Sequence, residues 1–210
     1  MRKLLLFEDF NPDSGIFIDE RDGNQYKTIR VNDTIWMAEN FRYNYTLKTM
    51  DKHSGFWNML DIKKPEVKKS SVPEYGLYYN FAAAQMAKPK GWEIPSEYDW
   101  QELIIEFAEG KTGKEKYQMA FKNLASPEYE NERFNRDEMG ISGFNALPGG
   151  YYLKNSDYLK EDMIRSLFWT SDQTRMSNYR LYYYFDDYGN ISAQGYPEST
   201  LMNVRYIKKK

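Results

Sequence analysis

The stretch Gly91-Trp92-Glu93-Ile94-Pro95-Ser96-Glu97-Tyr98-Asp99-Trp100 contains the clearest helix start in the chain. Ser96 follows a proline and is a favoured N-cap, and Asp99 stands three positions later, where a capping box places its acidic residue. Gly110 supplies a stop, and between the two signals apolar side chains recur at helical spacing at Trp100, Leu103, Ile104, Phe107 and Ala108. The pattern predicts a helix with one apolar face between Ser96 and Gly110.

Helical patterns also flank this segment on both sides. Residues 79–87 contain three consecutive alanines, which combine high helix propensity with a small packing face, and Pro89 and Gly91 end the segment. Residues 114–124 carry apolar side chains that fit a third, weaker helix. We therefore expect two main helices and one weaker helix in the middle of the chain.

Both ends of the chain have the pattern of short strands. In residues 14–43, the turn Asp22-Gly23-Asn24 separates two apolar segments and predicts a hairpin. From Gly143 onward, aromatic runs alternate with turn residues, and the run 180–185, a turn at 186–190 and the run 191–193 predict a second hairpin. Helices in the middle and strands around them predict an α+β fold with short, twisted antiparallel sheets.

The domain organisation follows from length and local composition. A chain of 210 residues can bury a core of its own, and no repeat of solenoid length is present. Residues 44–74 lack periodicity and are rich in lysine and proline, which is typical of a solvated loop. We expect one domain over residues 1–210, with an N-terminal extension at 1–13 and a long insertion or loop at 44–74.

The composition excludes several kinds of active site. The chain has no Cys and one His, His53, which stands in a polar stretch typical of a surface turn. Thiolate nucleophiles, thiolate metal sites, catalytic triads and two-His metal sites therefore cannot be built within one chain. Any metal site would need oxygen ligands, and we expect no cofactor and no enzymatic activity.

Charge and hydropathy exclude further partners. The 29 positive and 31 negative residues nearly cancel, so we expect no nucleic-acid partner. The apolar run Leu4–Phe7 is shorter than an export signal, and no stretch is long enough to span a bilayer. These features predict a protein without a membrane span, either cytoplasmic or carried outside by an assembly.

The candidate binding residues are tyrosines and arginines of the C-terminal half, because these two residue types dominate binding hot spots. On a strand, Tyr182 and Tyr184 share one face and Tyr183 and Phe185 share the other. One face is expected to enter the core, and the other is either a binding surface or an ordinary amphipathic face. The candidates are Tyr151, Tyr152, Arg175, Tyr179, Arg180, Tyr182 and Tyr184.

Other chemistry-bearing residues have structural interpretations that we favour. Asp186 and Asp187 are weak candidates for a divalent cation, but a turn needs the same residues, so no metal site is predicted. The large indoles are expected to pack in the core, with sugar stacking as the alternative, and paired glycines permit a tight turn or close backbone approach. These structural candidates are Trp36, Trp92, Trp100, Trp169, Gly149 and Gly150.

Five ordered segments resemble the Fibrobacter succinogenes major paralogous domain family (FISUMP), over roughly residues 16–208. The segments are Asp19–Ile29 with Trp36–Phe41, Tyr75–Ala84, Gly91–Trp100, Gly143–Tyr151, and Phe168–Ser171 with Val204–Ile207. The resemblance implies a C-type-lectin-like α+β fold, whose C-terminal half generally presents ligand loops. The family is common on the cell surfaces of Bacteroidetes and related bacteria, so the resemblance also implies that location. The family has no established general activity, so the resemblance implies none for this chain.

The chain also departs from that family pattern. Asn32 and Thr34 replace a usual Gly and Gln, and Glu93 replaces a usual His. Tyr206 replaces a usual Cys, so a disulfide typical of exported members is absent. This absence weakens the interpretation as a surface lipoprotein and leaves room for an intracellular or assembly-borne member. Related enzymes of the fold group need active-site cysteines or a His-rich iron site, which this chain lacks. The resemblance to those enzymes therefore extends to the scaffold and not to their chemistry.

Three functions compete at this point. The leading hypothesis is a non-enzymatic recognition or structural module that binds a protein partner, as a component of a surface or injection assembly. The alternative is a calcium-independent, carbohydrate-binding lectin-like protein, because the loop motifs of calcium-dependent lectins are absent from the sequence. A glycosidase that uses only carboxylates is the weakest hypothesis, because acidic pairs occur by chance among 31 acidic residues.

Overall fold

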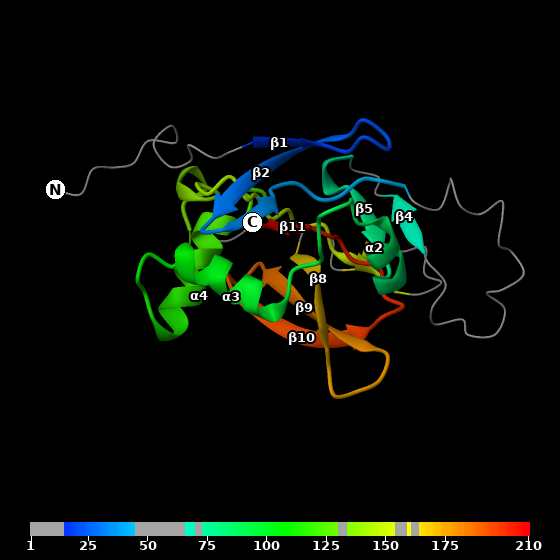
Figure 1. The fold of residues 1–210 in the computed structure, drawn as a ribbon. Helices are drawn as coiled ribbons and strands as arrows, with labels where there is room; N and C mark the ends of the chain where they lie inside the picture. Colours follow the sequence, from blue (N-terminus) through cyan, green and yellow to red (C-terminus); the bar gives the residue numbers. More distant parts are fainter. Residues whose placement is uncertain (1–14, 45–65, 70–72, 130–133, 154–158, 161–163) are drawn as a thin grey trace, which may run out of the picture.

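The computed structural model describes residues 15–44, 66–69, 73–129, 134–153, 159–160 and 164–210. Within these ranges the chain forms helices and short antiparallel sheets, as Figure 1 shows, which confirms the α+β class. The predicted extension at residues 1–13 and His53 lie outside the described residues.

A four-stranded sheet joins the N-terminal region to the C-terminus. Its strands are β1 (Gly15–Ile18), β2 (Gln25–Val31), β3 (Thr34–Met37) and β11 (Ile207–Lys209), in the order β1-β2-β3-β11. The predicted turn at residues 22–24 connects β1 and β2, and Gly23 there has a φ of +79°. The prediction missed a second turn, at Asn32 (φ 53°), which splits the expected second strand into β2 and β3. Asparagine tolerates this left-handed backbone conformation.

A three-stranded sheet forms the lower half of the molecule in Figure 1. It consists of β8 (Arg165–Gln173), β9 (Tyr179–Asp186) and β10 (Ile191–Pro197), in the order β10-β9-β8. The predicted hairpin is therefore confirmed as β9 and β10, with Tyr184 opposite Ser192.

Two smaller sheets complete the β structure. One pairs β4 (Val67–Lys69) with β5 (Leu77–Tyr79), and the other pairs β6 (Tyr151–Tyr152) with β7 (Leu159–Lys160). Short 3-10 helices occur at Pro73–Tyr75 and Arg136–Glu138. Strand β4 thus lies within the segment 44–74 that was expected to be a loop, and residues 45–65 and 70–72 of that segment lie outside the described residues.

Three α-helices are described, one more than the two main helices expected. Helix α3 (Glu97–Glu106) has the predicted capping box, because Ser96 accepts from the Asp99 backbone and Asp99 accepts from that of Ser96. Helix α2 (Phe81–Ala87) begins two residues later than predicted, because Asn80 caps it and the residues before Asn80 belong to β5. Helix α4 (Gly113–Leu124), expected to be weak, is a full helix of 12 residues.

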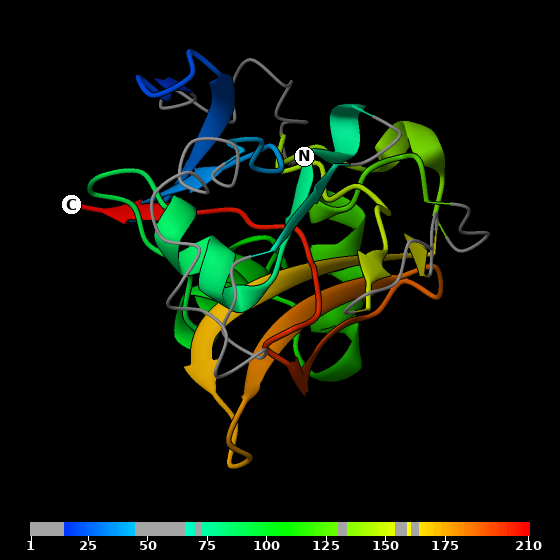
Figure 2. The same cartoon turned by 90° about the vertical axis from the view of Figure 1, so that its right-hand side faces the viewer.

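The β8–β9–β10 sheet lies between two layers of the core. Figure 2 shows α2 in front of this sheet and the green helices α3 and α4 behind it. The apolar face predicted for α3 is buried against the back of the sheet, in a cluster with Phe121, Phe168 and Phe185. The front layer gathers Phe81, Trp169 and other aromatics around α2 and β5. The sheet therefore contacts aromatic residues on both faces.

Candidate functional site

The alternation predicted along β9 decides which tyrosines face which layer. Tyr183 and Phe185 belong to the cluster formed with α3 and α4, while Tyr182 and Tyr184 point to the opposite face. On that opposite face we define the tyrosine array as Tyr151, Tyr182, Tyr184 and Tyr196, which come from β6, β9 and β10.

The members of the tyrosine array contact one another in a chain. The ring of Tyr196 lies 5.6 Å from that of Tyr151 and 5.7 Å from that of Tyr182, both nearly perpendicular, and Tyr182 lies 6.0 Å from Tyr184. The hydroxyls of Tyr151 and Tyr196 are 3.2 Å apart. The guanidinium of Arg165 lies 5.2 Å from the centre of the Tyr184 ring. These ring–ring and cation–π contacts restrict the orientations of the rings.

Exposure differs within the tyrosine array. Tyr182 is a candidate binding residue by sequence, but it is only 2% exposed and belongs to the core, so its ring is closed to a partner. Strand β9 meets aromatic layers on both sides there, and Trp169 is the neighbour of Tyr182 on β8. Tyr151, Tyr184 and Tyr196 are half-buried, so these three rings offer the accessible part of the array.

The remaining predicted binding residues lie apart from the tyrosine array. Tyr152 is buried against Tyr78 in a small separate cluster. Arg180 forms an ion pair of 2.8 Å with Glu198, and its guanidinium lies 4.3 Å from the centre of a phenylalanine ring of α2. Tyr179 is half-buried at the start of β9, and Arg175 is exposed in the turn between β8 and β9. Arg180 therefore ties the end of the sheet to α2.

Sequence reasoning missed Tyr196, Arg165 and Gln194. Gln194 is exposed on β10, and its side-chain oxygen accepts a 3.1 Å hydrogen bond from the Tyr182 hydroxyl. A signal was available, because the antiparallel register of the predicted hairpin places Gln194 and Tyr196 on the same face as Tyr182. Arg165 had no such signal, since its approach to Tyr184 depends on the pairing of β8 with β9.

A polar groove runs between α3, α4 and the β9–β10 hairpin, with a volume of about 490 Å³. We call it the helix–sheet groove. The buried Tyr183 reaches it with its hydroxyl, which accepts a 2.6 Å hydrogen bond from Gln101. Burial, together with the nearby Glu97, raises the pKa of Tyr183 to about 12, so this phenol stays protonated at neutral pH. The groove is lined by Glu97, Gln101, Lys114, Tyr117, Tyr183, Tyr184, Asn190, Ile191, Ser192 and Ala193.

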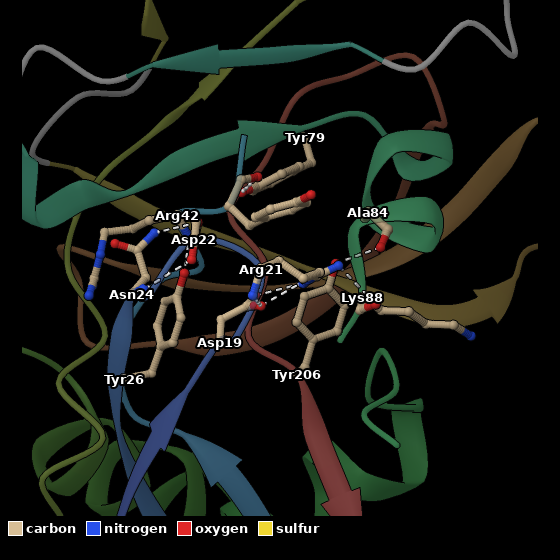
Figure 3. A network of polar contacts seen from close by, with 11 residues as sticks. Asp19, Arg21, Asp22, Asn24, Tyr26, Arg42, Tyr79, Ala84, Lys88 and Tyr206 are labelled. Carbon is tan, nitrogen blue, oxygen red and sulfur yellow. Dashed lines mark hydrogen bonds and ion pairs between the residues drawn. The ribbon is translucent and has the colours of Figure 1, made fainter. Parts of the chain in front are cut away.

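A second polar network, drawn in Figure 3, joins the first hairpin to α2. Asp19 is 2% exposed and accepts two side-chain hydrogen bonds from Arg21, at 2.8 and 2.7 Å. Arg21 also donates to the Lys88 carbonyl at the end of α2. Tyr206, which stands where a cysteine was expected, donates to the Ala84 carbonyl at 2.5 Å. The bonds to the Lys88 and Ala84 carbonyls join the first hairpin and the C-terminal segment to α2, so this network has a structural role.

Arg205 is buried in the core without an ion-pair partner among the described residues. It donates to the side-chain oxygen of Asn40 at 2.9 Å, to the Asn145 carbonyl at 2.8 Å and to the Phe144 carbonyl. Burial lowers the pKa of Arg205 to about 9, which leaves it charged at neutral pH. The acceptors belong to two segments far apart in the chain, at residue 40 and at residues 144–145, so Arg205 acts as a structural cross-link.

The acidic residues do not form a metal site within the described ranges. There, no group of three or more His, Asp or Glu side chains is placed to hold an ion. Asp186 accepts hydrogen bonds from the backbone N–H groups of Tyr188 and Asn190 and from the Asn190 side chain, and Asp187 is half-buried beside it. The bonds to Asp186 hold the turn between β9 and β10.

The four tryptophans predicted to have structural roles lie in the interior. Trp36, Trp100 and Trp169 are at most 1% exposed and Trp92 is 7% exposed. A side chain at Gly149 would lie 3.1 Å from both Asn203 and the Tyr78 hydroxyl, and Gly150 has a φ of +64°. The indoles thus contribute to packing, and the two glycines permit a close approach followed by a left-handed turn.

The sequence was compared with protein families, with curated proteins and with solved structures. The family model of the Fibrobacter succinogenes major domain matches residues 29–208. The chain belongs to this family. Neither the curated proteins nor the solved structures gave a match.

The Fibrobacter succinogenes major domain, as matched here, begins in β2 and ends in β11. It therefore includes the tyrosine array and the helix–sheet groove, while β1 precedes it. In the part of the chain that the structure describes, no helix has the length and the apolar character needed to cross a bilayer.

Proposed function

We propose that this chain is a non-enzymatic recognition module that binds a protein partner through the tyrosine array. The observation that carries the proposal is the contact chain from Tyr151 through Tyr196 and Tyr182 to Tyr184. All of its rings except that of Tyr182 are half-buried, and Arg165 lies beside Tyr184. Tyrosine and arginine supply large contact areas in protein interfaces. Rings that are already ordered lose little conformational entropy on binding.

A finer description of the fold belongs to the same proposal. We place the α+β arrangement in the C-type-lectin-like group, which the family resemblance implies. The pairing of β11 with β3 supports this, because it brings the two ends of the matched domain into one sheet. The C-terminal location of the tyrosine array agrees with the half of such folds that carries ligand loops.

The proposal extends to the setting of the protein. We propose that it serves as a component of a bacterial surface or injection assembly, of the kind found in Bacteroidetes and related bacteria. A module that presents an aromatic surface and joins its first and last described strands in one sheet suits a structural or adaptor role.

The decisive experiment is partner capture with matched variants. Tagged protein is used to capture material from its source cells, with washes at raised salt, and the retained proteins are identified by mass spectrometry. We expect a stoichiometric partner with the wild-type chain and its loss with Tyr184→Ala and Tyr196→Ala. Tyr188→Ala is the control, because Tyr188 is 62% exposed and lies outside the array. A partner retained equally by all variants would refute the role of the array.

The helix–sheet groove favours a second candidate function, calcium-independent saccharide binding. Its lining offers amides, hydroxyls and the ring of Tyr117, and Glu97 and Lys114 balance in charge. Such groups hydrogen-bond sugar hydroxyls while a ring covers the apolar face of the sugar. A glycan array followed by titration calorimetry tests it, with binding lost in Tyr117→Ala and kept in Tyr117→Phe. Failure to bind any glycan would remove this candidate.

A further inference from the structure

Strand β10 has an open edge. Within the described residues it is the outermost strand of the order β10-β9-β8 and pairs with β9 alone (Figures 1 and 2). Among the described residues, no backbone bridge covers its outer side. The opposite edge of the same sheet differs, because Gly150 and Asn203 form bridges with Ser166 and Phe168 of β8. In the described part of the chain, one edge of the sheet is therefore covered and the other has no backbone partner.

The sequence of β10 lacks the usual protection of an exposed edge. Its residues are Ile191-Ser192-Ala193-Gln194-Gly195-Tyr196-Pro197, none of which is charged. Natural proteins protect open edges with charged residues, especially lysine, and β11 at the edge of the other sheet carries Lys208 and Lys209. Proline stands only at the last position of β10. A neutral edge of this length is suited to pair with another strand.

The same sequence is complementary to itself. If two β10 strands pair antiparallel about Gln194, Ala193 stands opposite Gly195 of the second copy and Ser192 stands opposite its Tyr196. Small residues thus face one another or face a larger one, and no like charges meet. The side-chain oxygen of Gln194 already accepts from Tyr182, so its amide nitrogen can donate to Gln194 of the second copy.

We propose that the chain forms a two-fold symmetric dimer by antiparallel pairing of β10 with β10 of a second copy. The two three-stranded sheets then become one six-stranded sheet, which satisfies the backbone groups of both open edges. The hairpin register places three residues of β10 on the face of the tyrosine array: Ser192 opposite Tyr184, Gln194 opposite Tyr182 and Tyr196 opposite Arg180. Because the two-fold axis of such a pair is perpendicular to the sheet, both tyrosine arrays lie on the same face of the joined sheet. The dimer presents two copies of the surface to a repetitive partner, which increases apparent affinity.

The test is the molar mass of the purified full chain in solution. Light scattering coupled to size-exclusion chromatography, over a range of protein concentrations, is expected to give twice the 25.1 kDa of one chain. Gln194→Glu and Gln194→Lys each place like charges at the two-fold axis and are expected to weaken the dimer by about tenfold or more. Ile105→Lys adds the same charge at an exposed position of α3 and is expected to leave the mass unchanged.

A mixture of the two Gln194 variants separates dimer loss from misfolding. Opposite charges then meet at the axis, so the 1:1 mixture is expected to recover the dimeric mass. A wild-type mass of one chain at every concentration would overturn the proposal. A dimer whose stability is the same in wild type and in both Gln194 variants would overturn it as well. The outcome is independent of partner capture, since a monomer can bind through the array and a dimer can form without any partner.

Discussion

The two faces of the β8–β9–β10 sheet are both aromatic, yet they differ in what they leave exposed. On the face toward α3 and α4, Phe168, Tyr183 and Phe185 are at most 1% exposed. On the other face, Tyr151 and Tyr184 stay half-buried. The comparison teaches that the covering helices, and not the residue type, determine whether an aromatic residue serves as core or as accessible surface.

The largest expected effect is alkaline unfolding, driven by the buried phenols. Burial raises the pKa of each above its ordinary value of 10; the residues are Tyr26, Tyr79, Tyr129, Tyr183 and Tyr206. Above pH 10 the folded state therefore binds more protons than the unfolded chain. Each phenol then lowers the free energy of unfolding by up to about 1.4 kcal/mol per pH unit as pH rises.

Arg205 has the opposite effect on the pH dependence of stability, but it is one group against five phenols. Its pKa of about 9 is below the ordinary value of 12.5, so its contribution to stability increases with pH between these values. Circular dichroism and tyrosinate absorbance are recorded together against pH. Above pH 10, the buried phenols are expected to ionise in the same cooperative step in which the circular dichroism of the fold is lost. Ionisation of all 19 tyrosines near pH 10 while the fold persists would show that the buried layer is open to water.

Trp100→Ala is expected to be the most damaging single substitution on the helix side. The Trp100 ring lies within 5.0–6.3 Å of five other aromatic rings, from Trp36, Phe144, Phe168, Tyr183 and Phe185. Truncation leaves a large cavity and is expected to cost about 4 kcal/mol. Urea unfolding followed by circular dichroism measures it, and a loss below about 1 kcal/mol would contradict the closed packing of this face.

Arg205→Met tests the cross-link behind the sheet. The change keeps most of the apolar volume but leaves the Asn40 oxygen and the Phe144 and Asn145 carbonyls without their donor. We expect a loss of about 3 kcal/mol in the free energy of unfolding. Arg205→Lys retains one charged donor and should recover part of that loss. Equal stability of Arg205→Met and wild type would mean that water replaces the guanidinium.

Tyr183→Phe has a smaller expected effect. It removes the hydroxyl that Gln101 contacts in the helix–sheet groove while keeping the ring that stacks on Trp100. The expected loss is about 1 kcal/mol, measured as the urea midpoint with an unchanged slope. Gln101→Ala should give a similar loss, and the double variant should cost little more than either. Full additivity would show that the two groups do not interact.

The smallest stability effect is expected on the tyrosine array. Tyr184→Ala removes a half-buried ring at the border of the core and should change the free energy of unfolding by about 1 kcal/mol, since part of the ring stays in contact with water. Partner capture should nevertheless be lost with this variant. A stability loss as large as that of Trp100→Ala would mean that the two faces of the sheet are equally closed and that Tyr184 belongs to the core.

Local patterns sufficed for elements whose signals lie within a few residues. The capping box of α3 and the turn after Asp186 were correctly predicted, because the groups that form them are neighbours in the chain. The division of β2 from β3 was missed, because its two-residue turn, Asn32-Asp33, lacks the glycine that most clearly marks such turns. Strand β4 was missed because it forms only by pairing with β5.

The sequence by itself determined the α+β class, the family membership of residues 29–208 and the alternation of Tyr182 and Tyr184 against Tyr183 and Phe185. Periodicity and local hydrogen bonding depend on near neighbours, so these features can be read from the chain. Only the tertiary structure decided that Tyr182 is closed while Tyr184 is accessible, that Tyr196 completes the array, and that Arg205 links distant loops. Burial and long-range contacts depend on which elements pack together, and that information lies in no single stretch of sequence.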